Sequence, residues 1–240
     1  FKLILFLSGS TAIIFIFIFV FNYKFSKRLV MKYVEENAEN FTNSMVNRVE
    51  SVLHAARKIP EHIALFLEEG DLTRERMMEM MRLVTANNEE IYGIGVAYEP
   101  YAFDKEQLYF APYYYKEEGQ LKKYDNMGSS TYRYFYLDWY QLPRELKKAV
   151  WTEPYFDEGA GNIVMSTYSV PFYREAKGEK RFTGIVTIDI SLDWLQHIVS
   201  NIKIGETGYA FLITTKGTFV THPNPRMIMN DTMFKMAENR

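Results

Sequence analysis

The sequence predicts an α+β protein in which helices come first and antiparallel strands follow. Three observations support this prediction. Residues Leu3–Phe21 form an apolar run without a charge, and apolar residues at helical spacing continue to about residue 68. From Ile91 onward, short strand-like segments alternate with turns that contain glycine or proline. Helix-forming and strand-forming residues are therefore segregated along the chain, which is the pattern of α+β folds.

The composition excludes several classes of function. The chain has 240 residues, a formal net charge of -2 and no cysteine. A nucleic-acid-binding domain normally has a strong basic excess, so we expect no nucleic-acid partner. The absence of cysteine excludes disulfides, thiolate metal sites and cysteine nucleophiles. The 18 tyrosines are concentrated between Tyr92 and Tyr173, and such enrichment is typical of a wet surface that contacts a ligand.

The N-terminal apolar run predicts a transmembrane helix over residues 1–23. A helix from Leu3 to Phe21 is roughly 28 Å long, close to the hydrocarbon core of a bilayer. A cleaved signal peptide is not favoured, because the run is long and no small-residue cleavage site follows it. Four basic residues follow the run: Lys24, Lys27, Arg28 and Lys32. By the positive-inside rule they would place the following chain in the cytoplasm, so the residue charges alone leave the orientation open.

Residues 24–90 are predicted to form a long straight helix and then a second helix. Apolar residues recur every eleven residues in two series: Val30, Phe41, Val52 and Ile63, and Val34, Met45, Ala56 and Leu67. A spacing of about 3.67 residues per turn keeps an apolar stripe on one face of a nearly straight helix. We expect this stripe to join two copies of the chain in a homodimer. Gly70 ends the long helix, and Thr73 is expected to cap the second one.

The remaining chain is predicted to contain mostly strands. We expect strands over residues 91–99, 108–116, 121–124, 132–137, 162–173 and 182–192, with short helices over 143–150 and 192–202. A further strand pair over 209–214 and 218–221 begins a second sheet, which the chain is not expected to complete. Residues 91–200 and 201–240 are therefore predicted to belong to two successive domains.

Several stretches resemble the double Cache sensor domains of bacterial transmembrane receptors. Those similar to the membrane-distal lobe are Trp139–Tyr140, Trp151–Asp157, Thr167–Pro171 and Gly184–Leu192, and those similar to the membrane-proximal lobe are Gly205–Leu212 and Gly217–Pro223. The resemblance implies two PAS-like lobes beside the long helix. The distal lobe would be complete in residues 91–200 and the proximal lobe partial in 201–240. It also implies that residues 24–240 are periplasmic and that the chain is anchored in the inner membrane.

The resemblance further implies a ligand site in the distal lobe, similar to that of the members that sense amino acids or amines. The candidate ligand-binding residues are Tyr132, Trp139, Tyr140, Tyr155, Asp157 and Asp189. Two carboxylates suit an ammonium group, because they accept short charge-assisted hydrogen bonds. The aromatic rings would add cation–π attraction.

This chain departs from the family pattern at one position of that site. The family has an arginine two residues before the tryptophan, where this chain has Leu137. A guanidinium grips a ligand carboxylate in a bidentate manner, which other side chains do less well. We therefore expect a ligand with a cationic amine, with or without a carboxylate. Arg133 would replace the missing arginine only if its side chain points inward.

Both carboxylates also have simpler interpretations. Asp157 begins the stretch Asp157–Gly161, a natural turn, so it could serve only to cap that turn. Asp189 interrupts the apolar strand Ile185–Ile190, where a buried carboxylate needs a partner or a wet cavity. Strand alternation could instead turn it toward solvent.

The sequence thus favours the sensory part of a transmembrane receptor. It lacks a phosphate-binding glycine loop, a nucleophile elbow and an HExxH motif, so we expect neither catalysis nor a cofactor or metal in this segment. The expected function is to bind a small amine or amino acid and to pass a helix shift to a cytoplasmic output domain, as in two-component systems. The alternative is an ectodomain that binds another protein or no ligand at all.

Overall fold

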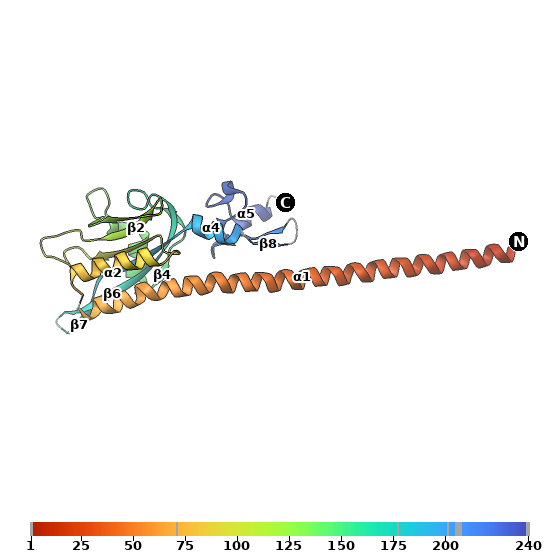
Figure 1. The fold of residues 1–240 in the computed structure, drawn as a ribbon, viewed down its shortest axis with the longest axis horizontal. Helices are drawn as coiled ribbons and strands as arrows, with labels where there is room; N and C mark the ends of the chain where they lie inside the picture. Colours follow the sequence, from red (N-terminus) through yellow and green to blue (C-terminus); the bar gives the residue numbers. More distant parts are fainter. Residues whose placement is uncertain (1, 71, 177, 201, 205–207, 239–240) are drawn as a thin grey trace. The chain divides into compact units, whose positions relative to one another are not determined.

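The computed structural model describes residues 2–70, 72–176, 178–200, 202–204 and 208–238 (Figure 1). The chain divides into two compact units, residues 1–51 and residues 52–240. The first unit is the N-terminal part of α1 (Lys2–Glu69), and the second contains the end of α1 and all the other elements. The predicted class is confirmed, because helices precede an antiparallel sheet.

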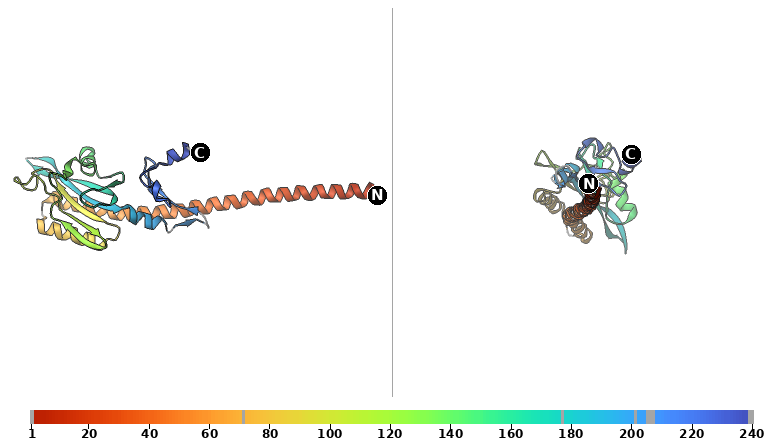
Figure 2. Two further views of the ribbon diagram at one scale, coloured as in Figure 1. Left: turned by 90° about the horizontal axis from the view of Figure 1, so that it is seen from above. Right: turned by 90° about the vertical axis from the view of Figure 1, so that its right-hand side faces the viewer.

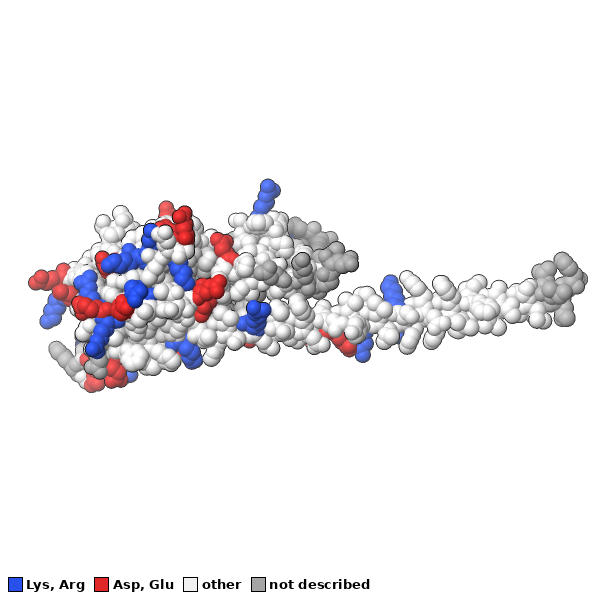
Figure 3. Space-filling view, in the orientation of Figure 1, with Lys and Arg blue, Asp and Glu red and all other residues white. Residues whose placement is uncertain are grey.

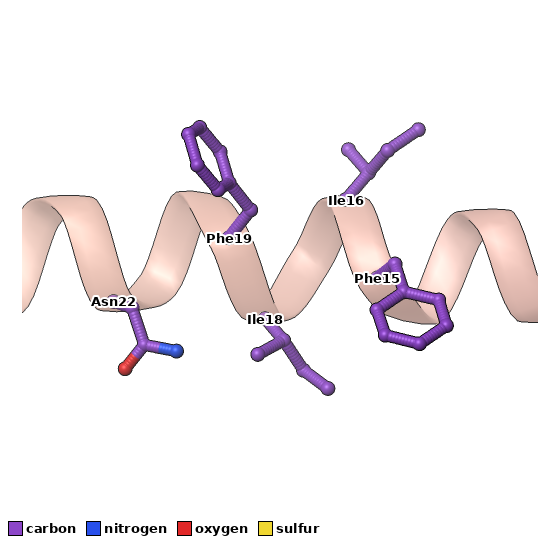
Figure 4. A pocket seen from close by; sticks show the side chains of 5 residues that line it. All are labelled: Phe15, Ile16, Ile18, Phe19 and Asn22. Atoms are coloured by element: carbon purple, nitrogen blue, oxygen red, sulfur yellow. The ribbon is translucent and has the colours of Figure 1, made fainter.

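The first unit contains a helix that is long and apolar enough to cross a membrane, the only such helix in the described part of the chain. Phe17 and Phe19 expose 71% and 73% of their surface, so no other element covers them. Residues 7–23 of α1 include no charged residue, and no charged side chain is visible over a long part of this helix in Figure 3. Ile16 and Phe19 project from one side of this stretch and Ile18 from the opposite side (Figure 4). Apolar side chains thus surround the helix, as expected of a membrane span.

The second unit begins with two helices that pack on the sheet. The end of α1 runs through Pro60 and buries Ala56, Ile63 and Leu67, three members of the predicted apolar series. The second helix, α2 (Arg74–Asn87), is capped by Thr73, whose hydroxyl accepts a hydrogen bond from Arg76 N at 3.3 Å. This cap, which satisfies one of the free N–H groups of the first turn, was predicted from the sequence and is confirmed.

The main sheet has seven strands, all paired in antiparallel fashion. Six of them follow the order β3-β2-β1-β7-β6-β4, and β5 also pairs with β6. The strands are β1 (Gly93–Tyr98), β2 (Tyr113–Glu117), β3 (Gln120–Tyr124), β4 (Val150–Trp151), β5 (Tyr155–Phe156), β6 (Val164–Ala176) and β7 (Glu179–Ser191). The predicted hairpin turn at Glu118 and Gly119 joins β2 to β3 and is confirmed. Both glycine and glutamate have positive φ there, as a tight hairpin turn requires.

Strand alternation gives the sheet two different faces. On one face, Ile94, Val96, Ile188 and Ile190 pack in the cluster that also contains Leu67 of α1. The opposite face carries the alternate residues of β1 and β7, and it packs under α3 (Asp138–Leu146) through Tyr140 and Ile185. Figure 2 shows α3 and α2 on opposite sides of the sheet. Among the described residues, the buried carboxylates, Asp157 and Asp189, lie on the side of the sheet under α3.

The segment before α3 corrects two sequence predictions. Residues 132–137 were predicted to form a strand, but they contain the 3-10 helix η1 (Tyr134–Tyr136). The hydroxyl of Tyr134 donates to Tyr98 O at 2.7 Å and accepts from Phe110 N at 3.2 Å, which holds this segment across the sheet face. The helix predicted over 143–150 begins earlier, at Asp138, and ends where Lys147 adopts a φ of 52°.

After the sheet, α4 (Leu192–Ser200) leads to a set of short elements. The strands β8 (Lys203–Ile204) and β9 (Gly208–Tyr209) pair with each other, as do β10 (Leu212–Ile213) and β11 (Phe219–Thr221). The 3-10 helix η2 (Pro225–Met227) and α5 (Met233–Glu238) follow. The strand predicted over 209–214 is therefore divided between two pairs, and the first residues of the Gly205–Leu212 stretch lie outside the described residues.

Candidate ligand-binding site

The register of three strands sets the floor of the site. Asp189 on β7 lies opposite Gly93 on β1 and opposite Thr167 on β6. Side chains of directly opposed residues project from the same face, so the three positions form one row across the sheet. The row is glycine, aspartate and threonine, and it lies on the face under α3.

Tyr113 on β2 reaches this row because β1 has glycines beside it. A Cβ at Gly93 would lie 2.2 Å from Tyr113 Oη, and a Cβ at Gly95 would lie 3.4 Å from its Cδ2. Any larger residue at Gly93 would therefore occupy the place of the ring. With glycine there, the ring extends across β1, and its hydroxyl donates to Asp189 Oδ2 at 2.8 Å.

Asp189 is buried and accepts two hydrogen bonds. It exposes 3% of its surface, so the alternation that could have turned it toward solvent turns it inward. Thr167 Oγ1 donates to Oδ1 at 2.6 Å, while Tyr113 holds Oδ2. The Thr167 hydroxyl has one proton, so Tyr155 Oη donates to Thr167 Oγ1 across 2.7 Å. Tyr155, Thr167 and Asp189 thus form a directed chain of hydrogen bonds.

Asp157 is the second buried carboxylate, with 4% of its surface exposed. Its Oδ1 accepts from Tyr132 Oη at 2.9 Å, and its Oδ2 accepts from Gly161 N at 2.7 Å. Its backbone also closes the loop, since Asn162 N donates to Asp157 O at 2.8 Å. Asp157 therefore shapes the turn and also holds a carboxylate beside the sheet, so the two interpretations of this residue are compatible.

Burial dominates the electrostatics of both acids. Desolvation raises the pKa of Asp189 to about 7, although the hydrogen bonds from Thr167 and Tyr113 act in the opposite direction. Desolvation also raises the pKa of Asp157, opposed by the bonds from Gly161 and Tyr132. For Tyr113, burial and then the nearby Asp189 raise the pKa of the hydroxyl far above its usual range, so it remains a donor. Burial thus disfavours the ionised form of each acid, and a cation placed beside the carboxylates would favour it.

The two carboxylates face one small inner cavity of about 10 Å³, on the scale of a single water molecule. Its lining residues are Tyr113, Met127, Tyr132, Trp139, Tyr155, Asp157, Met165, Thr167, Thr187 and Asp189. None of these described residues is a lysine, arginine or histidine. An outer cavity of about 690 Å³ shares Tyr132, Trp139, Tyr155 and Asp157 with it. The two cavities therefore meet at a wall of three aromatic rings and one carboxylate.

Five of the six candidate residues line the inner cavity, namely Tyr132, Trp139, Tyr155, Asp157 and Asp189. Tyr140 does not line either cavity. It is fully buried, and its hydroxyl donates to Glu99 Oε2 at 3.2 Å. Leu137 and Arg133 line the outer cavity, where Arg133 is exposed and its Nε donates to Ser130 O at 3.1 Å. Within the described residues, no group of three or more potential ligands could hold a metal ion.

Sequence reasoning missed several residues that complete the cavity. Thr187 lies two positions before Asp189, so strand alternation could have placed it on the same face. Thr167 has a comparable signal, as a polar residue in a buried strand. Tyr113 has none, because Tyr113, Tyr114 and Tyr115 are consecutive and only the register with Gly93 and Gly95 decides which ring reaches Asp189.

Comparison with protein families gives a match over half of the chain. The family model described as "Methyl-accepting chemotaxis protein-like, first PDC sensor domain" matches residues 77–197. These residues include most of α2, the seven-stranded sheet and all the residues that line the inner cavity.

Known proteins are similar to this chain over most of its length. Methyl-accepting chemotaxis protein TlpB of Bacillus subtilis is 27% identical over 197 residues, which are 82% of this chain and 26% of TlpB. The chain thus spans about a quarter of that relative. The extracellular domain of mmHK1S-Z3, a protein described as a histidine kinase, has a TM-score of 0.67 and 27% identity, covering 78% of this chain and 70% of that domain.

A second similar structure contains a bound ligand. It is the ligand-binding domain of the amino acid chemoreceptor PctC of Pseudomonas aeruginosa PAO1 in complex with GABA. Its TM-score is 0.58 with 18% identity, over 82% of this chain and 79% of that domain. At this identity the similarity is one of fold.

Proposed function

This chain belongs to the family of first PDC sensor domains of methyl-accepting chemotaxis protein-like receptors, and we propose that it senses a small ligand with a cationic amine. One observation carries the proposal. Asp157 and Asp189, both buried, face one cavity whose described lining contains no basic side chain. Burying a carboxylate without a counter-charge is costly, and a ligand ammonium would offset that cost.

The aromatic residues support the same ligand class. Tyr132, Trp139 and Tyr155 line both cavities, so a ligand that reaches the carboxylates must pass their rings. A cation near an aromatic face gains about 0.5–2 kcal/mol, depending on how far it is desolvated. PctC is an amino acid chemoreceptor, and GABA carries an ammonium group, so a ligand of this class is compatible with the fold.

Ligand binding would be transmitted as a shift in the populations of two conformations of the domain. A ligand that binds one packing of the sheet more tightly moves the equilibrium by its differential affinity. Strand β6 connects the site to the helix, since Thr167 bonds to Asp189 and the next residue, Tyr168, bonds to Glu61 of α1. A displacement of α1 by an ångström or so would then pass to the membrane, across a dimer of parallel helices.

The proposal extends to topology. Residues 1–23 would form the membrane span, 24–90 the stalk, 91–200 the membrane-distal lobe and 201–240 the start of the membrane-proximal lobe. Residues 24–240 would lie in the periplasm, with the anchor in the inner membrane. The output domain would be a chemotaxis signalling domain or a kinase, as in TlpB and mmHK1S-Z3.

The testing experiment is a thermal-unfolding screen of the full chain in nanodiscs against amines, amino acids and small carboxylates. At 100 times its Kd, a ligand adds about 2.7 kcal/mol, a rise of roughly 5–10 °C for a domain of this size. We expect stabilisation by amines that Asp157→Ala and Asp189→Ala both abolish. A flat response across the panel would overturn the proposal and favour an ectodomain that binds a protein or no ligand.

A further inference from the structure

The inner cavity limits how much of a ligand it can take. Its volume of about 10 Å³ suits a group the size of one water molecule, and an ammonium head is of that size. The outer cavity of about 690 Å³ begins at the same four residues, Tyr132, Trp139, Tyr155 and Asp157. A ligand whose ammonium lies between Asp157 and Asp189 must therefore place the rest of its atoms in the outer cavity.

The outer cavity favours positive charge. Apart from Asp157, its lining includes three carboxylates, Asp138, Glu153 and Glu158, against two cations, Arg133 and Lys216. Tyr136 and Phe156 add two more aromatic side chains to the three that it shares with the inner cavity. Carboxylates interleaved with aromatic rings form a surface that binds cations. One of the N–H groups of the Arg133 guanidinium is already engaged, since Nε donates to Ser130 O.

Lys216 comes from a different part of the fold. It lies in the turn between β10 and β11, which is closed by hydrogen bonds from Gly217 N to Thr214 O and from Thr214 N to Thr218 O, both of 2.9 Å. The strand that follows the turn, β11, packs through Val220 in the same cluster as Leu195 of α4. Lys216 Nζ lies 4.0 Å from Glu153 Oε1, so this amine approaches a carboxylate that lines the outer cavity.

We propose that the ligand is a diamine or polyamine whose second cationic group enters the outer cavity and takes the place of Lys216 beside Glu153. This inference rests on the proposed function, because the first ammonium must lie between Asp157 and Asp189. Lys216 is then a tethered competitor for the outer position, and ligand binding separates the β10–β11 turn from the main sheet. Occupancy of the site is thereby communicated to the elements that follow α4.

The experiment compares three ligands with the same four-carbon chain: putrescine, butylamine and γ-aminobutyrate. Their affinities for the full chain in nanodiscs are measured by isothermal titration calorimetry at low salt, for the wild type, Glu153→Gln and Lys216→Met. The control is Lys180→Met, which removes an exposed lysine that lines neither cavity. We expect wild-type protein to bind putrescine more tightly than butylamine.

The variants are expected to act in opposite directions. Lys216→Met should tighten putrescine binding about two- to fivefold, the range of an exposed ion pair, and Glu153→Gln should weaken it by a similar factor. Butylamine binding should not change in either variant, and Lys180→Met should behave as wild type. If Lys216→Met instead weakens γ-aminobutyrate binding and leaves putrescine unchanged, Lys216 anchors a carboxylate and the inference is wrong.

The two proposals fail in different ways. Butylamine could bind as tightly as putrescine, with an affinity that Asp189→Ala abolishes. The proposed ammonium site between Asp157 and Asp189 would then be supported, and the second cation position beside Glu153 would be ruled out. If neither amine binds to the wild type, the proposed function is wrong, and the inference that rests on it is wrong too.

Discussion

Tyr168 on β6 donates a hydrogen bond to Glu61 on α1, with 3.0 Å between Oη and Oε1. The preceding residue, Thr167, projects from the opposite face of the strand and donates to Asp189. The residue that contacts the cavity acid and the residue that contacts α1 are therefore adjacent in the chain. Farther along β6, Tyr173 N and Arg174 Nε also donate to α1, at Glu68 Oε1 and Leu67 O, but both lie farther along the strand from Thr167. The Tyr168–Glu61 contact thus gives a direct connection from the proposed site to α1.

Tyr168→Phe is expected to weaken the connection between sheet and helix without changing the cavity. Loss of the bond to Glu61 should lower the free energy of unfolding by about 1 kcal/mol, since Glu61 is partly exposed. Amine affinity should be nearly unchanged, but ligand-induced displacement of α1, measured by electron–electron distances between spin labels, should decrease.

Tyr173→Phe is the matched control for that variant. The Tyr173 hydroxyl is buried on the same strand and has no hydrogen-bond partner among the described residues. Its removal should therefore leave the free energy of unfolding unchanged or slightly higher. Equal destabilisation by the two variants would show that the Tyr168–Glu61 bond contributes nothing beyond packing.

Amine binding is expected to weaken as the pH falls below about 7, the raised pKa of Asp189. An ammonium binds the ionised carboxylate, so at lower pH it must displace a proton, and the Kd should rise by about tenfold for each pH unit. Asp157, whose pKa is also raised, steepens the dependence. Calorimetry in buffers of different ionisation enthalpy should detect the released proton. An affinity that is constant between about pH 5.5 and about pH 8 would contradict this assignment.

Asp189→Asn is expected to stabilise the fold at neutral and higher pH while abolishing amine binding. The pKa of about 7 in the folded chain lies above the ordinary value of 3.8, so the folded state binds the additional proton. The stabilising contribution of that proton is complete below the ordinary pKa and is lost as the pH rises through about 7. Once Asp189 is ionised, its burial lowers the free energy of unfolding by at most about 4 kcal/mol relative to the protonated form.

The measurement for that variant is thermal unfolding at about pH 5 and about pH 8. The gain in Tm over wild type should be roughly 5–10 °C larger at the higher pH. Asp125→Asn serves as the control, because Asp125 is exposed and forms a surface ion pair with Lys123. If the gain in Tm did not depend on pH, the pKa of Asp189 would not be raised in the folded chain, and this prediction would be wrong.

The sequence was sufficient to predict the fold class because each half of the chain has a strong local signal. The apolar run and the eleven-residue series specify α1, and the turn residues Glu118 and Gly119 specify the β2–β3 hairpin. Residues 132–137 were mistaken for a strand because aromatic residues favour strands locally. The bonds of Tyr134 to Tyr98 and Phe110 are tertiary contacts, which local preference does not reveal.

The carboxylates of the site could be predicted, but most of what surrounds them could not. Asp189 was conspicuous because it interrupts an apolar strand, and Asp157 because it matches the family pattern. The positions of Tyr113 and Lys216 depend on strand register and on the packing of β11 against α4, neither of which is encoded in spacing. A one-residue change in register would move Tyr113 to the other face.

Gly93→Ala is expected to weaken amine binding through Tyr113. The added Cβ would lie 2.2 Å from Tyr113 Oη and 2.6 Å from its Cζ, so the ring must leave its position and its bond to Asp189 Oδ2. A hydrogen bond to a charged group contributes about 1.5–3 kcal/mol, so amine affinity should fall at least about tenfold. Tyr113→Phe, which removes the hydroxyl and keeps the ring, should lose affinity but less stability than Gly93→Ala. Calorimetry and thermal unfolding of both variants separate the two effects. Wild-type affinity in Gly93→Ala would show that the Tyr113–Asp189 bond is not needed to hold the ligand.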